Sequence, residues 1–225
     1  MVKFGMVIDL DKCTACQACT VACKAENNVS FQKPEESVTR GMFWNDVLTS
    51  TEGEYPSAKM KFLPRPCMHC ERPPCVQVCP VGASFKNQDG VVLVNYERCI
   101  GCRYCLIACP YNLRYFNWRV PEFPDSMKSY VNPLVPVRPR GVAEKCTFCI
   151  QRITAGKSTA RKEKRELRDG DIVPACVQTC TGKARTFGDL DNPDSKVSKL
   201  IKSNRAFVLL EEKGTHPQVY YLTEG

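Results

Sequence analysis

The chain has 225 residues, 43% of them hydrophobic, and a formal net charge of +8. This composition is ordinary for a globular protein and excludes a wholly disordered chain. Its longest apolar runs fall far below the roughly 18 residues that cross a bilayer, so we expect no transmembrane segment of its own. The unusual feature is the count of sixteen cysteines. The chain opens with MVKFGMVIDL and shows no signal peptide, which disfavours a disulfide framework.

Short regular elements are predicted around the cysteines in the first half of the chain. The segments 4–13 (FGMVIDLDKC) and 91–99 (VVLVNYERC) are each predicted to form a strand that runs into a cysteine loop. Helical turns are predicted after these loops, within 18–28 and 105–112. The insertion 24–66 contains Trp44 and the turn-like TEGEYP, and it is interpreted as including a hairpin that covers part of the site.

The second half is predicted to be less regular. Residues 110–145 include the proline-rich VNPLVPVRPRG and are expected to form an extended strap. The charged run 156–171 is expected to be a solvated helix or loop, with contact to a membrane surface or a partner as the alternative. A short helix and two strands are expected in 193–222.

All sixteen cysteines fall into four groups of four, and each group ends with the spacing C-x3-C. The groups are Cys13, Cys16, Cys19 and Cys23; Cys67, Cys70, Cys75 and Cys79; Cys99, Cys102, Cys105 and Cys109; and Cys146, Cys149, Cys176 and Cys180. In the run C-x2-C-x2-C-x3-C-P of two-cluster ferredoxins, the fourth cysteine binds the other [4Fe-4S] cluster, so each motif needs a partner motif. Four groups therefore predict two reciprocal pairs.

Chain length between groups indicates which of them pair. Only 19 residues separate Cys79 from Cys99, so the second and third groups are expected to be partners. The first and fourth groups are then left to each other.

Zinc is the alternative metal, because two CxxC pairs can form a structural zinc site, and the split fourth group could be one by itself. A Rieske centre needs two histidine ligands, and His69 and His216 are the only histidines. The charge of +8 would suit nucleic acid. However, each oxidised four-iron cluster with its four thiolates carries about −2, so four clusters would nearly cancel that charge.

The four motifs, together with RPRGVAEKCTFC, PACVQTC and GDLDNPDSKVS, resemble the iron–sulfur subunits of molybdopterin oxidoreductases of the dimethyl sulfoxide reductase family. The likeness is greatest to the arsenate, tetrathionate, polysulfide and sulfite branch. The resemblance implies an α+β fold of two ferredoxin-like modules, each with two [4Fe-4S] clusters and long loop insertions. The outer module would be 1–59 with 116–225, including a C-terminal extension, and the nested module 60–115.

The resemblance also implies the ligands of four [4Fe-4S] clusters, which we call sets A to D. Set A is Cys13, Cys16, Cys19 and Cys180; set B is Cys23, Cys146, Cys149 and Cys176; set C is Cys67, Cys70, Cys75 and Cys109; set D is Cys79, Cys99, Cys102 and Cys105. Some relatives have tryptophan in the third motif and hold a three-iron cluster there. Cys102 at this position favours four clusters of one type, although Lys24 and Thr181 stand where ferredoxin motifs often have proline.

The chain carries no phosphate-binding loop, dinucleotide fingerprint or Ser/His/Asp set, so no catalytic residues are expected. The resemblance implies a non-catalytic subunit that relays electrons between a molybdopterin catalytic subunit and a quinone-linked membrane subunit. It would be peripheral to the membrane, on the periplasmic side by co-export with a partner or else on the cytoplasmic face. The alternatives are a soluble polyferredoxin or hydrogenase-linked carrier, and a zinc-stabilised nucleic-acid-binding module. The electron-transfer interpretation predicts no nucleic-acid partner.

Overall fold

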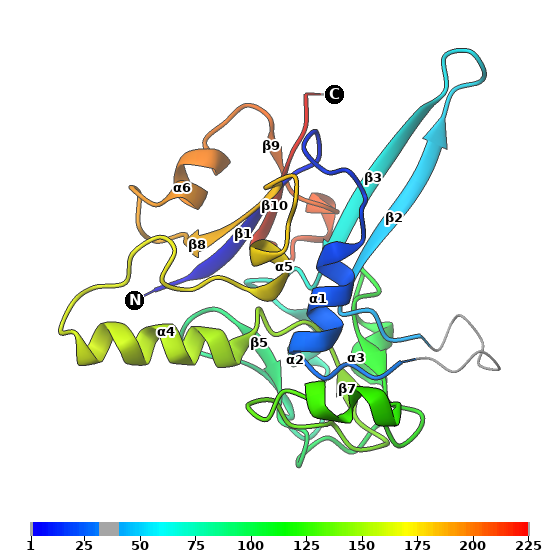
Figure 1. Ribbon diagram of the computed structural model, residues 1–225, viewed down its shortest axis with the longest axis vertical. Helices are drawn as coiled ribbons and strands as arrows, with labels where there is room; N and C mark the ends of the chain where they lie inside the picture. The colour runs from blue at the N-terminus through cyan, green and yellow to red at the C-terminus, as the bar shows by residue number, and fades with distance from the viewer. Residues whose placement is uncertain (1, 32–40, 225) are drawn as a thin grey trace.

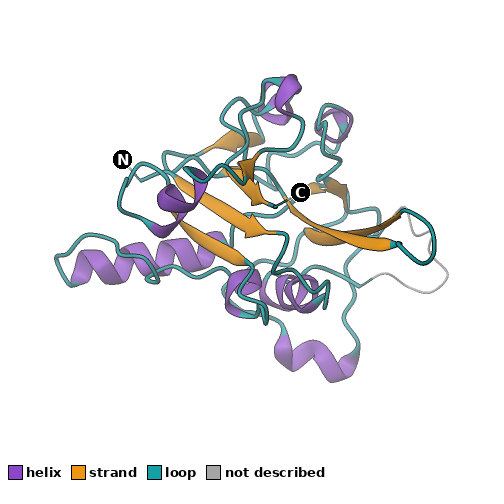
Figure 2. Cartoon of the chain, turned by 90° about the horizontal axis from the view of Figure 1, so that it is seen from above, coloured by secondary structure: helices purple, strands orange, loops and turns teal. Residues whose placement is uncertain are grey.

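The computed structural model describes residues 2–31 and 41–224, which form a mixed α+β structure (Figure 1). Two elements project from the body: the hairpin of β2 (Asn45–Glu52) and β3 (Lys59–Pro66), and helix α4 (Ile150–Lys162). The view from above shows the same two projections at opposite sides (Figure 2). Within the described ranges, no helix is both long enough and apolar enough to span a membrane.

The largest sheet joins the two ends of the chain in the order β8-β1-β10-β9. Strand β1 (Phe4–Asp9) is buried along its whole length, pairs antiparallel with β8 (Arg185–Asp189) and runs parallel to β10 (Val219–Leu222). Strand β9 (Ala206–Phe207) pairs with the outer side of β10. The apolar alternation in the sequence therefore places the N-terminal strand at the centre of a sheet closed by C-terminal segments.

The four short helices that carry cysteines pack in two pairs. Helix α1 (Ala18–Glu26) packs against α5 (Ala175–Gln178), and α2 (Pro74–Gln77) packs against α3 (Tyr104–Ile107). The first cysteine group therefore lies beside the fourth, and the second beside the third.

The remaining elements are short. Strand β4 (Ser84–Lys86) pairs antiparallel with β5 (Val92–Val94), and β6 (Tyr115–Phe116) with β7 (Ala143–Glu144). Helix α6 (Lys196–Ile201) begins at Ser195, whose hydroxyl accepts the backbone N–H of Ser198. Two 3-10 helices are also present: η2 (Asp125–Tyr130) and η3 (Glu211–Lys213).

Most of the predicted elements are confirmed, with one exception. The strands, the helical turns, the hairpin within 24–66 and the C-terminal helix and two strands are all present, although residues 32–40 of the insertion lie outside the described ranges. The charged run contains the second half of α4 and the loop after it. The wholly extended strap at 110–145 is wrong, because η2 interrupts it. Pro124 before that turn and Asp125 in its first turn favour a helical start.

A buried ion pair fixes this strap to the core. Arg138 and Glu144 are 2% and 0% exposed, and Arg138 Nε lies 3.1 Å from Glu144 Oε2. Arg138 also donates to the carbonyls of Asn27 at 2.5 Å and Asn28 at 2.7 Å, just after α1 ends. Trp44 Nε1 donates to the same Glu144 carboxylate at 3.2 Å. Burial raises the pKa of Glu144 despite the nearby guanidinium, so the carboxylate depends on Arg138 for its charge.

We expect Arg138→Met to cost about 3–5 kcal/mol of folding free energy, because it leaves the buried Glu144 carboxylate without its cation and removes the donor from two helix-end carbonyls. Chemical denaturation of the full chain measures this loss. The matched control is Arg140→Met, two residues away on an exposed side chain, which should cost less than about 0.5 kcal/mol. Equal losses from both variants would contradict a structural role for the buried pair.

Candidate metal centres

The four cysteine loops share one unusual backbone turn. The residue two positions after the first cysteine of each group has positive φ: Ala15 (52°), His69 (42°), Gly101 (70°) and Phe148 (53°). L-residues rarely adopt this conformation, and it persists where the surrounding structure requires it. At Gly101 an added Cβ would also lie 2.3 Å from the Gly141 carbonyl oxygen. The sequence repeat is thus a repeat of backbone geometry.

Set A lines a single cavity. Cys13, Cys16, Cys19 and Cys180 all contribute to its wall. Val47 and Pro64, which are paired residues near the base of the hairpin, line the same cavity. Cys13 interacts electrostatically with Cys19 and Cys180, and Cys16 Sγ lies 3.5 Å from the hydroxyl of Thr181. The hairpin expected to cover part of the site therefore lies over set A.

Set B is brought together from three parts of the chain. Cys23 interacts electrostatically with Cys146, Cys149 and Cys176. Asn27, one turn after Cys23, has its side-chain amide 3.7 Å from Cys23 Sγ and 3.6 Å from Cys149 Sγ. This N–H donor therefore points at two thiols that are 126 positions apart in the sequence.

Sets C and D lie in the part of the chain between β3 and β6. Cys70 interacts electrostatically with Cys67, Cys75 and Cys109, which are the other members of set C. Within set D, Cys105 interacts with Cys99.

The other two members of set D are located through their neighbours. Cys79 Sγ accepts the backbone N–H of Ser84 at 3.4 Å, and the Ser84 hydroxyl accepts from Arg114, which interacts with Cys105. Cys102 precedes α3 and is assigned from its spacing alone.

Electrostatic interactions connect thiols of different sets. Cys176 of set B interacts with Cys19 of set A. Cys146 of set B interacts with Cys67 of set C, and Cys105 of set D interacts with Cys75 of set C. These interactions follow the order A–B–C–D.

Burial makes several of the thiols poor anions without a metal. It raises the pKa of Cys70 and of Cys146 to about 12, and that of Cys149 to about 11. Iron binds thiolate, so metal binding must supply the energy for their deprotonation. All sixteen cysteines are free rather than paired as disulfides, and the grouped, reduced thiols fit iron–sulfur clusters. Among the described residues, no three His, Cys, Asp or Glu side chains converge on a point that could hold one metal ion.

Exposure differs along the row. Cys16 of set A and Cys102 of set D are exposed, whereas all four cysteines of set B are buried. An electron carrier has to bring its redox centres close to a partner at its surface. The two end sets provide such points, and the inner sets are shielded.

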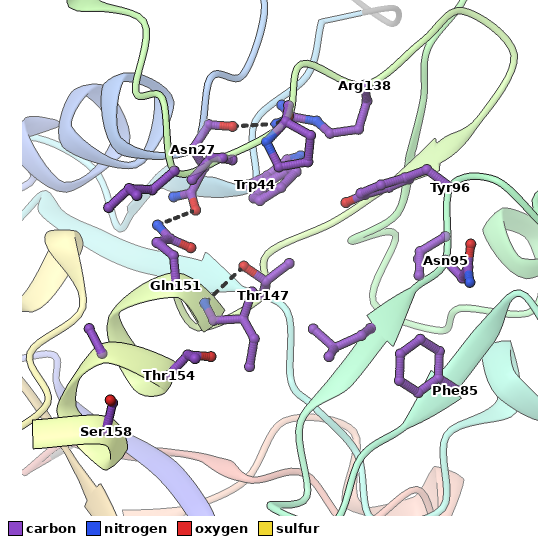
Figure 3. A pocket seen from close by; sticks show the side chains of 17 residues that line it. Asn27, Trp44, Phe85, Asn95, Tyr96, Arg138, Thr147, Gln151, Thr154 and Ser158 are labelled. Carbon is purple, nitrogen blue, oxygen red and sulfur yellow. Dashed lines mark hydrogen bonds between the residues drawn. The ribbon is translucent and has the colours of Figure 1, made fainter. Parts of the chain in front are cut away.

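A cavity of about 730 Å³ has Asn27 in its wall (Figure 3). It lies between α4, β5 and the strap, and Trp44, Phe85, Tyr96 and Ile150 give it an apolar wall. At its edge Gln151 donates to the Asn27 side-chain oxygen at 3.3 Å. The cavity wall thus includes the asparagine whose amide faces set B.

Sequence reasoning did not single out three side chains that approach the thiols. Asn27 follows Cys23 by four residues, and Arg114 and Arg185 follow Cys109 and Cys180 by five each. The shared offset of the two arginines is a signal that the sequence contains. Burial of both side chains, each 5% exposed, becomes visible only in the folded chain.

Comparison with known proteins identifies the cofactor. Residues 12–83 and 58–124 each match a 4Fe-4S dicluster domain. These matches confirm the prediction of [4Fe-4S] clusters, and the zinc-stabilised nucleic-acid-binding alternative is set aside.

Curated relatives cover nearly the whole chain. It is 51% identical to the menaquinone reductase iron–sulfur cluster-binding subunit of Nitratidesulfovibrio vulgaris, across 99% of this chain and 89% of the relative. It is 40% identical to a sulfite dehydrogenase subunit of Allochromatium vinosum, across 99% and 83%. It is 36% identical to the arsenate respiratory reductase iron–sulfur subunit of a Shewanella species, across 98% and 96%.

Such identity over almost the full length of each chain confirms the resemblance noted in the sequence. The chain therefore belongs to the iron–sulfur subunits of the dimethyl sulfoxide reductase family of molybdoenzymes, and it is a non-catalytic electron-transfer subunit with four [4Fe-4S] clusters.

Proposed function

We propose that the chain relays single electrons along the row A–B–C–D, between a molybdopterin catalytic subunit and a quinone-linked membrane subunit. The cysteines of sets A to D are the proposed ligands. The observation that carries the proposal is the order of the thiol interactions, with an exposed thiol at each end of the row. The named relatives belong to reductases and dehydrogenases, which supports a permanent place in a complex over a free polyferredoxin.

The clusters supply the one-electron chemistry, and the chain supplies their positions and electrostatics. Backbone N–H groups of Ala184 and Phe148 lie 3.2 Å and 3.4 Å from Cys180 Sγ and Cys146 Sγ. Together with the Asn27 amide, these donors stabilise negative charge on sulfur, which favours the reduced form.

The division into two modules is part of the proposal. Strand pairing of β1 with β8 joins the start of the chain to its last third, and β4 pairs with β5 inside 60–115. The packing of α1 on α5 and of α2 on α3 supports the same division. The outer module would hold sets A and B, and the nested module sets C and D.

Surface character suggests which partner meets which end. Near set D, Ile100, Tyr104 and Ile107 are 65%, 55% and 82% exposed. Exposed apolar residues that cluster beside a redox centre mark an interaction site, and we assign this face to the membrane subunit. Set A, beside the projecting hairpin, would face the molybdopterin subunit. The chain would be peripheral to the membrane. If the complex lies on the periplasmic side, the chain would be exported together with a partner subunit.

Anaerobically purified protein should contain about sixteen iron and sixteen acid-labile sulfide per chain, since each of the four clusters holds four of each. Metal and sulfide analysis measures both. Zinc without labile sulfide would refute the relay.

The ligand sets predict which cluster a single substitution alters. Cys102→Ser should remove about one quarter of the iron or produce a three-iron signal in electron paramagnetic resonance, because set D loses one of four ligands. Cys180→Ser should alter the cluster of set A. If Cys180→Ser changes only the cluster held by Cys146, the reciprocal pairing is wrong.

A matched pair of surface variants tests the two ends. Ile107→Lys places a charge beside set D and should weaken binding of the membrane subunit at least tenfold, because the ammonium would lose water in an apolar contact. Val21→Lys, on α1 and 66% exposed, should spare that subunit and weaken binding of the molybdopterin subunit. Co-purification of tagged chain with each partner gives the readout. Loss of the same partner in both variants would contradict the assignment of ends.

A further inference from the structure

Two buried arginines occupy equivalent places in the two halves of the structure. Arg114 follows Cys109 in the segment PYNLR, and Arg185 follows Cys180 in TGKAR, each by five residues. In both segments the third residue after the cysteine, Asn112 or Lys183, has positive φ. A guanidinium stays charged in proteins, so each arginine brings a permanent positive charge into the interior, where an unpaired charge is costly.

Arg185 lies between sets A and B. Its Nη2 is 3.5 Å from Cys19 Sγ and donates to Asn45 Oδ1 at 2.7 Å, which holds the guanidinium in place. It interacts electrostatically with Cys19 and Cys180 of set A and with Cys176 of set B.

Arg114 has the corresponding position between sets C and D. Its Nη1 donates to the hydroxyl of Ser84 at 2.8 Å, and Ser84 itself stands five residues after Cys79. Its electrostatic partners are Cys67 and Cys75 of set C and Cys105 of set D.

Two of the guanidinium nitrogens of Arg114 lack an acceptor. Nε and Nη2 are buried, and neither has a hydrogen-bond partner among the described residues. Buried donors in native proteins are nearly always satisfied. These two N–H groups are therefore available to sulfur atoms of sets C and D, and Cys105 is one thiol with which the Arg114 side chain interacts.

A third basic side chain lies at set B, close to the loop that carries set C. Lys145 is fully buried, and its Nζ donates to the carbonyls of Cys146, at 2.5 Å, and of Val92. It interacts electrostatically with Cys146 of set B and with His69, which lies inside the motif of set C.

We propose that Arg185, Lys145 and Arg114 are the shared counter-cations of the relay, one at each junction between successive clusters. This inference rests on the ligand sets proposed above. Each oxidised cluster with its thiolates carries about −2 and gains one more negative charge on reduction. A cation shared by two neighbours stabilises the added electron on either of them, so the electron can cross the junction without meeting uncompensated repulsion.

The two arginines provide a reciprocal test. In the full chain with all clusters present, Arg114→Gln should make clusters C and D harder to reduce and leave A and B unchanged. Arg185→Gln should do the reverse. The expected effect is at least a tenfold fall in the ratio of reduced to oxidised cluster at a fixed ambient potential, which equals about 59 mV for one electron.

Redox titration followed by electron paramagnetic resonance gives this ratio. Signals of clusters D and A are assigned from their alteration in Cys102→Ser and Cys16→Ser. Arg114→Lys and Arg185→Lys retain the charge and should titrate within a few-fold of the parent. Arg161→Gln, at an exposed residue of α4, is the matched control and should leave the reduction of all four clusters unchanged.

Several results would overturn the inference. One is iron retained in full with no shift from either glutamine variant. Another is an equal change in the reduction of all four clusters in both glutamine variants, because a local cation should affect the neighbouring clusters most. If a glutamine variant loses iron, the corresponding lysine variant provides the test. The lysine keeps the positive charge, so a large change in cluster reduction in that variant would exclude a role for charge. A parent chain without about sixteen iron would instead refute the proposed function, and iron analysis before titration separates the two failures.

Discussion

Burial of negative charge is the constraint on which the rest of the structure depends. Four oxidised clusters with sixteen thiolates carry about −8 in total, and the chain without them carries +8. The positive charge is not confined to the exterior, where it could bind nucleic acid. Three of its members, Arg114, Lys145 and Arg185, are buried next to the thiols. Apo-protein would bury these cations without anions, and burial also keeps several thiols protonated, so cluster insertion and folding stabilise one another.

The same constraint explains why the chain returns, in its last third, to the side of its first cysteine group. The proposed set B takes Cys23 from the first group and its other three thiols from the fourth, and α1 packs against α5. The strap between them is fixed by Arg138, which reaches carbonyls at the end of α1 and the buried Glu144. Helices and strands this short are not stable alone. Metal ligation and buried polar interactions therefore hold them in place.

Much of this could be predicted from the sequence, for identifiable reasons. Cysteine spacing follows from the geometry of cluster binding. The four groups, and the closeness of the second to the third, could therefore be predicted from residue positions. The strand at 4–9 and the hairpin within 24–66 followed from alternation and turn residues. The 3-10 helix at 125–130 was missed because the prolines around it dominated the pattern. Asn27, Arg114 and Arg185 were missed because a polar residue near a cysteine has no significance until the fold shows that it is buried and directed at sulfur.

The central claim is the spatial order A–B–C–D, and locating iron in the loaded protein tests it most directly. Anomalous scattering at the iron edge, from crystals of anaerobically prepared full chain, would show each cluster with its cysteines. We predict four clusters in a row, with Cys23 and Cys146 on one cluster, Cys180 on the cluster of Cys13, and set B between sets A and C. A cluster that joins the first cysteine group to the second, as their order in the sequence would suggest, would contradict this arrangement.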